Sequence, residues 1–120
     1  MKEEFAKLGV EIAAVSSNTP ELAEKTVEAW GIQDLQVGHS LTFEDARRWG
    51  LHVSAGLGDS EPEHFSEPGL FLIRPDGTLF ASVVQTMPFT RPPADALLRS
   101  IAWIIENDYP ARGEIDPSTL

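Results

Sequence analysis

The pattern of apolar and polar residues predicts strands and helices that alternate along the chain. Residues Val10–Val15 form an apolar run interrupted by a single glutamate, which is typical of a strand buried on both faces of a sheet. The stretch Thr19–Trp30 begins with an N-capping residue, has Pro20 at its first helical position and is followed by Gly31 as a stop. A strand followed by an amphipathic helix indicates half of a βαβ unit.

Two shorter helices are predicted on either side of this pair. The segment Lys2–Gly9 has helical spacing and a terminal glycine but no N-cap, so we expect the chain to begin inside a helix. A second helix is expected to begin after Thr42, which has capping-box spacing, and to end at Trp49. Its adjacent Arg47 and Arg48 are interpreted as a solvated helix face rather than an anion site.

The clearest local signal is an antiparallel hairpin. The apolar segment Gly69–Ile73 and the strand-favouring segment Thr78–Val84 flank a Pro-Asp-Gly turn. The preceding segment, Ser54–Ser66, is rich in Gly, Ser, Asp, Glu and Pro and is therefore predicted to be a surface loop.

The last predicted element is a helix over Pro93–Asn107. Apolar residues recur along it at helical spacing, and Leu98, Ile101 and Ile105 are expected to be buried against a sheet. Residues 1–110 then form one domain, and residues 111–120 are expected to be a flexible C-terminal tail.

The amino-acid composition and net charge argue against some classes of binding partner. The chain has 120 residues and a hydrophobic content of 42%, which suits a single domain. Its 19 acidic and 9 basic residues give a formal charge of −10, which argues against nucleic acid and against an anionic membrane surface as partners. No apolar stretch approaches the roughly 20 residues needed to span a bilayer, and the first residues do not resemble a signal peptide. We therefore expect a cytoplasmic protein.

The chain contains no cysteine, which removes disulfides, thiolate metal sites and thiol nucleophiles from consideration. The three histidines, His39, His52 and His64, lie in different segments and lack the short spacing of zinc ligands. The sequence therefore predicts neither a metal site nor a cofactor.

Four stretches of the chain, in order, carry a family resemblance. They are Phe5–Ile12 with Ala14–Ser17, Phe65–Leu79, Gln85–Phe89 and Glu106–Glu114. Together they resemble the peroxiredoxin-like branch of the alkyl hydroperoxide reductase and thiol-specific antioxidant (AhpC/TSA) family, over Glu4 to Glu114. This resemblance implies an α/β, thioredoxin-like (glutaredoxin-like) three-layer fold that is N-terminally truncated, without the first strand and the start of the first helix.

The resemblance also locates what the chain lacks. In the family the peroxidatic cysteine lies at the N-terminus of the first helix, where the helix dipole favours the thiolate, and that region would precede Met1. No residue of this sequence can inherit the role, so we predict no catalytic residue. The expected function is that of an antioxidant or redox family protein that is inactive as a thiol peroxidase, with a thiol reductant as partner of a full-length form. Whether the chain is an enzyme stays open.

One family position does carry over. Thioredoxin folds have a cis-proline before the strand that opens the hairpin, facing the active cysteine, and Glu67-Pro68 before Gly69 matches that placement. We expect Pro68 to be cis and Glu67 to lie beside the family's binding cleft. The alternative is that Pro68 starts a strand in trans.

The alternative function is a non-catalytic thioredoxin-fold module that binds a protein or peptide next to Pro68.

A hydrolase using Ser66, His64 and Asp76 is a third hypothesis. No glycine pattern of a nucleophile elbow surrounds any serine, so ordinary polar residues are the favoured interpretation.

The missing strand has a consequence for association. In the thioredoxin fold it lies between the equivalents of Val10–Val15 and Gly69–Ile73, so its absence leaves two strands with unpaired edges. Such edges are templates for pairing. We expect the two strands either to pair directly or to promote self-association through their exposed edges.

Overall fold

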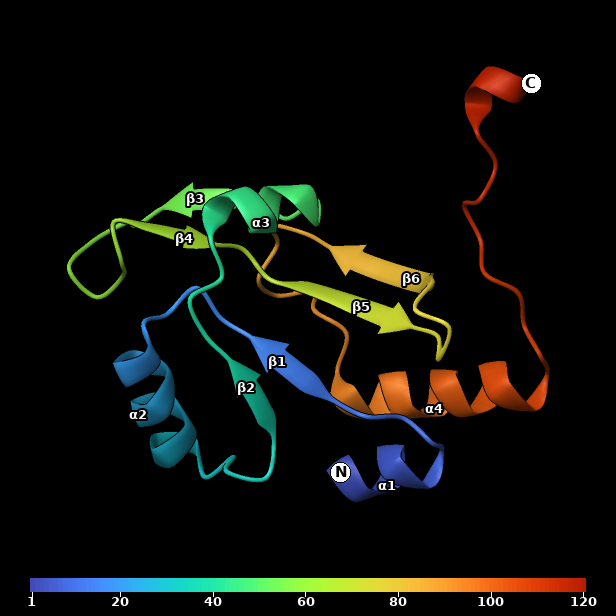
Figure 1. Ribbon diagram of the computed structural model, residues 1–120, viewed down its shortest axis with the longest axis horizontal. Helices are drawn as coiled ribbons and strands as arrows, with labels where there is room; N and C mark the ends of the chain where they lie inside the picture. Colours follow the sequence, from blue (N-terminus) through green and yellow to red (C-terminus); the bar gives the residue numbers. More distant parts are fainter. The chain divides into compact units, whose positions relative to one another are not determined.

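The computed structural model describes residues 1–120 and shows a mixed α/β chain with three two-stranded sheets. It divides into two compact units, Met1–Pro68 and Gly69–Leu120, each of which is described by itself. Figure 1 labels the elements, which are α1 (Lys2–Lys7), β1 (Ala13–Val15), α2 (Pro20–Trp30), β2 (Gln36–Gly38), α3 (Phe43–Arg48), β3 (Val53–Ala55), β4 (His64–Ser66), β5 (Gly69–Ile73), β6 (Leu79–Val84), α4 (Ala94–Glu106) and a final 3₁₀ turn over Pro117–Thr119.

The first unit contains a complete βαβ motif. Strands β1 and β2 are parallel, with Ala14 opposite Val37, and α2 forms the crossover between them (Figure 1). Helix α2 begins after Thr19, whose hydroxyl oxygen accepts the Leu22 N–H at 3.3 Å. It ends at Gly31, whose φ of 62° is a left-handed conformation that glycine adopts without strain. The predicted helix is confirmed, and β2 completes the half-unit that the sequence indicated.

The predicted loop over Ser54–Ser66 is wrong at both ends. Strands β3 and β4 form an antiparallel pair there, with Val53 opposite Ser66 and Ala55 opposite His64. Each strand has only three residues, which is too short for a period-two pattern to stand out from the surrounding Gly, Ser and Glu residues.

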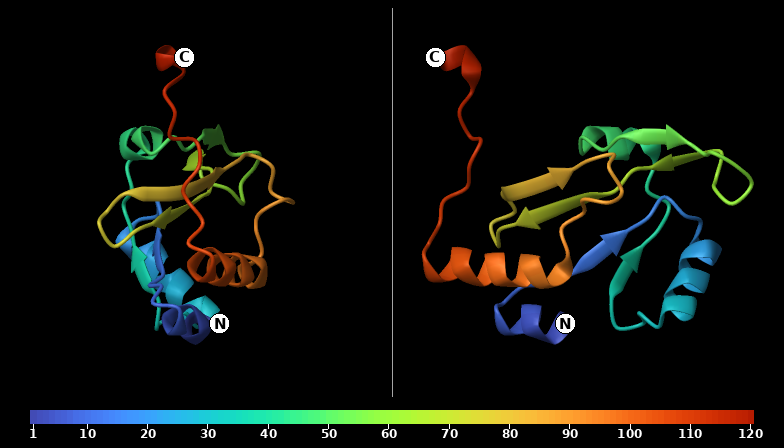
Figure 2. Two further views of the ribbon diagram at one scale, coloured as in Figure 1. Left: turned by 90° about the vertical axis from the view of Figure 1, so that its right-hand side faces the viewer. Right: turned by 180° about the vertical axis from the view of Figure 1, so that it is seen from behind.

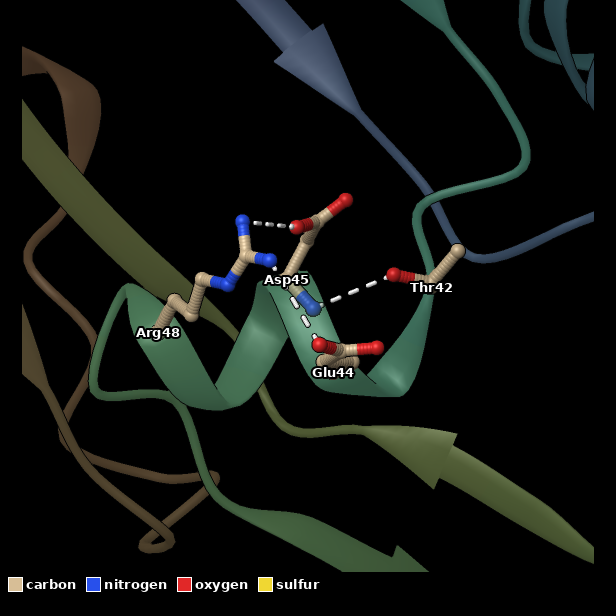
Figure 3. A network of polar contacts seen from close by, with 4 residues as sticks. All are labelled: Thr42, Glu44, Asp45 and Arg48. Atoms are coloured by element: carbon tan, nitrogen blue, oxygen red, sulfur yellow. Dashed lines mark hydrogen bonds and ion pairs between the residues drawn. The ribbon is translucent and has the colours of Figure 1, made fainter.

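Helix α3 has the predicted cap. The Thr42 hydroxyl oxygen accepts the Asp45 N–H at 3.1 Å (Figure 3). The guanidinium of Arg48 lies 3.4 Å from the Glu44 carboxylate and 3.2 Å from that of Asp45, and all three side chains are exposed or nearly so. The pairing of Arg48 within the helix and the exposure of Arg47 agree with the interpretation of the arginines as a solvated helix face.

The second unit contains the predicted hairpin and final helix. Strands β5 and β6 are antiparallel, with Leu70 opposite Val83, and α4 runs from Ala94 to Glu106. In the turn, one Asp76 carboxylate oxygen accepts both the Thr78 N–H at 2.9 Å and the Thr78 hydroxyl at 2.6 Å. These bonds hold the chain reversal that joins the two strands, together with Gly77 at a φ of 85°.

Burial differs from the sequence-based expectation at two places. All three residues of β1 are exposed, whereas a strand buried on both faces was predicted; β1 pairs only with β2, in a sheet of two strands. On α4, Ile101 is 7% exposed as predicted and Leu98 is half-buried, but Ile105 in the last turn is 54% exposed. The buried apolar residues are Phe5, Ala23, Ala46, Leu51 and Ile101.

No helix of the structure has the length and apolar character needed to cross a membrane.

Candidate functional site

The predicted site residue Glu67 lies at the end of the first unit, directly after β4. Its backbone N–H donates to the His52 carbonyl oxygen at 2.8 Å, which extends the β3–β4 ladder by one pair. Its side chain accepts a hydrogen bond from the Ser54 hydroxyl, with 2.8 Å between Oγ and Oε1. Ser54 and Glu67 are both half-buried. The β3–β4 pair therefore fixes the position of this carboxylate.

This arrangement limits what Glu67 can do chemically. A carboxylate bonded to one neutral hydroxyl keeps further lone pairs with which to accept hydrogen bonds from a ligand. General acid–base catalysis of hydrolysis commonly needs a second group or an activated nucleophile within hydrogen-bond reach. Glu67 with Ser54 is therefore not arranged as a catalytic pair, and its carboxylate can still accept hydrogen bonds. The Ser54 contact was missed because Ser54 was assigned to a loop.

The cis conformation expected for Pro68 is wrong. The structure contains no cis peptide bond, so the Glu67–Pro68 bond is trans. Trans is the ordinary preference of an X–Pro bond by about 0.5–1 kcal/mol, and the hydrogen bond from Glu67 to His52 continues the extended strand up to the proline. Pro68 is exposed.

The hydrolase hypothesis gains no support from the hydrogen bonds. The Ser66 hydroxyl donates to the Glu67 carbonyl oxygen at 3.1 Å rather than to a base. The Asp76 carboxylate is occupied by Thr78, and these hydrogen bonds, from the Thr78 hydroxyl first and its N–H second, lower the pKa of Asp76 from its ordinary value. Neither residue is arranged as a nucleophile or as an orienting acid.

Metal-binding chemistry has no geometric basis in the structure. No group of three or more His, Asp or Glu side chains lies close enough together to hold a metal ion. The imidazole Nδ1 of His39 instead lies 2.9 Å from the hydroxyl oxygen of its neighbour Ser40.

Comparison of the chain with protein-family models, with curated proteins and with solved structures finds no match.

Proposed function

We propose that the chain is a thioredoxin-like domain of the peroxiredoxin-like AhpC/TSA type. The observation that carries this proposal is the order of the elements. The chain contains a parallel βαβ unit, a short capped helix, an antiparallel hairpin and a long final helix in this order, as the proposal requires, and the β3–β4 pair lies between the short helix and the hairpin as an addition to it. The structure has three separate two-stranded sheets, whereas a thioredoxin fold has one continuous sheet.

The proposal includes the absence of thiol peroxidase activity. Reduction of a peroxide by this family starts with attack of a cysteine thiolate on the peroxide oxygen, and the chain has no cysteine. Carboxylates and histidines can move protons but cannot replace a nucleophile that the mechanism requires. The family relationship would therefore be one of fold without the associated redox chemistry in this chain.

An experimental structure of the full chain tests the fold. The thioredoxin-like proposal requires Ala14 and Val37 to be neighbours in a parallel pair and Leu70 and Val83 to be neighbours in an antiparallel pair, each detectable as interstrand nuclear Overhauser effects. The absence of either set would contradict it.

The alternative proposal is a non-catalytic module that binds a peptide or protein beside Pro68. It is favoured by one observation: Pro68 is exposed next to a carboxylate that the Ser54 hydrogen bond holds in place. Peptides selected from a displayed library should lose affinity for the Pro68→Ala variant and keep it for Pro75→Ala, a matched change in the hairpin turn. Equal binding to both variants would contradict a site at Pro68.

A further inference from the structure

The second unit has an open groove between β6, α4 and the segment that follows α4. Its volume is about 690 Å³, within the range of ligand sites. The floor is largely apolar, and Trp103 and Tyr109 lie with ring centroids 5.5 Å apart at a tilt of 55°. On α4 the lining residues are spaced three and four apart, so they form one face of the helix.

The groove differs in charge from the chain as a whole. Arg99 and Arg112 line it, and no carboxylate does, although the chain carries a net charge of −10. Arg112 donates to the Tyr109 hydroxyl oxygen at 3.0 Å, which leaves most of its N–H groups free. Arg99 lies 2.9 Å from the Asp95 carboxylate, but both side chains are largely exposed, and such a pair exchanges readily with another carboxylate.

The segment Gly113–Leu120 has the complementary chemistry. It includes Glu114 and Asp116 on either side of Ile115, whose side chain is 70% exposed. The side-chain hydrogen bonds of this segment stay within it: one Asp116 carboxylate oxygen accepts the Ser118 N–H at 2.9 Å. The same bond lowers the pKa of Asp116, so this carboxylate is charged at neutral pH. Figures 1 and 2 show the segment running away from α4 in every view.

We propose that the groove of each copy of this chain binds residues Glu114–Asp116 of a second copy. Ile115 packs on the aromatic floor, and the flanking carboxylates pair with Arg99 and Arg112. Reciprocal exchange of the two segments closes a two-fold dimer, the commonest symmetry of homo-oligomers. The proposal is independent of the family assignment, since it uses only the second unit.

Sedimentation velocity across a concentration series tests the dimer with the full chain and with a variant ending at Arg112. The full chain should dimerise, and the shortened variant should have a dissociation constant at least tenfold higher. Ile115→Ser should weaken the dimer similarly, whereas Leu57→Ser should not; Leu57 is a matched control because its side chain is also exposed, at 96%, in the β3–β4 loop.

A labelled peptide of residues 113–120 identifies the groove. It should bind the shortened variant saturably, lose at least tenfold in affinity when Arg99→Glu is added, and bind more weakly as salt rises. The proposal would be overturned if the full chain is monomeric and the peptide binds the shortened variant but not the full chain. That result would show that the segment folds onto the groove of its own chain. A dimer whose dissociation constant is unchanged by removal of the segment would also overturn it, because another surface would then hold the two copies together.

Discussion

The Ser54 hydroxyl on β3 donates a hydrogen bond to the Glu67 carboxylate, across the end of a strand pair. Both groups are half-buried, so the bond should contribute to stability. Ser54→Ala should lower the free energy of unfolding by about 0.5–1.5 kcal/mol. Urea denaturation measures the change, with Ser60→Ala in the exposed loop as control. Equal stabilities of the two variants would show that the bond to Glu67 is not formed in solution.

Two isoleucines on α4 provide a matched test of its buried face. Ile101 is buried and Ile105 is 54% exposed. Ile101→Ala should cost about 2–5 kcal/mol, because it removes buried methylene groups and leaves a cavity. Ile105→Ala should cost less than about 1 kcal/mol, since its side chain already contacts water. Thermal or urea unfolding that ranks the two variants in the opposite order would mean that the other face of the helix is buried.

The hydrogen bonds of the hairpin turn should make the stability of the fold depend on pH through Asp76. Hydrogen bonds from Thr78 lower the folded-state pKa of Asp76 below its ordinary value of 3.8, with the hydroxyl as the larger cause. Because the folded pKa is the lower one, this contribution to stability is present above the unfolded pKa and is lost as pH falls through the folded pKa.

Thr78→Val removes the hydroxyl but keeps the N–H, so it should raise the Asp76 pKa towards 3.8 without fully restoring it. Carbon-13 NMR titration of the carboxyl groups measures this directly. The pKa of Asp95 is lowered by Arg99 and should not move. An unchanged Asp76 pKa in the variant would contradict the hydroxyl contact.

Strand edges are expected to provide a second mode of self-association. Strands β1 and β5 each have one hydrogen-bonded neighbour, β2 and β6 respectively. Unpaired edges recruit strands from other chains, so we expect concentration-dependent association with slow hydrogen exchange at the β1 and β5 amides. Light scattering across a dilution series, combined with hydrogen exchange, tests this. A monodisperse monomer that protects the amides of both strands would mean that no partner chain is needed.

Helix boundaries were predictable because caps are local. Thr19 with Gly31, and Thr42 with Asp45, mark α2 and α3 through contacts within three or four residues of the helix ends. The hairpin was predictable for the same reason, since its turn chemistry lies between two apolar runs. Strands β2, β3 and β4 were not, because strands of three residues carry too little periodicity.

The sequence did not predict which residues are buried or which contacts form at the candidate sites, because both depend on residues that are far apart in the chain. The apolar run up to Val15 does not indicate how many strands pair with it. Because β1 pairs with β2 alone, its residues are exposed rather than buried as predicted. Glu67 was named from the resemblance alone, and its partner Ser54 lies 13 residues away. The groove joins Phe80 on β6 to Arg99 on α4 and to Arg112 beyond it, a combination that no local pattern indicates.

The proposed function combines a peroxiredoxin-like fold with the absence of thiol chemistry, and the second part can be tested directly. The most direct measurement is the rate of peroxide consumption by the purified chain, driven by dithiothreitol or thioredoxin after metals are chelated. The account predicts a rate equal to that of buffer, because no thiolate is present to attack the peroxide. Consumption above buffer that scales with protein concentration would contradict it.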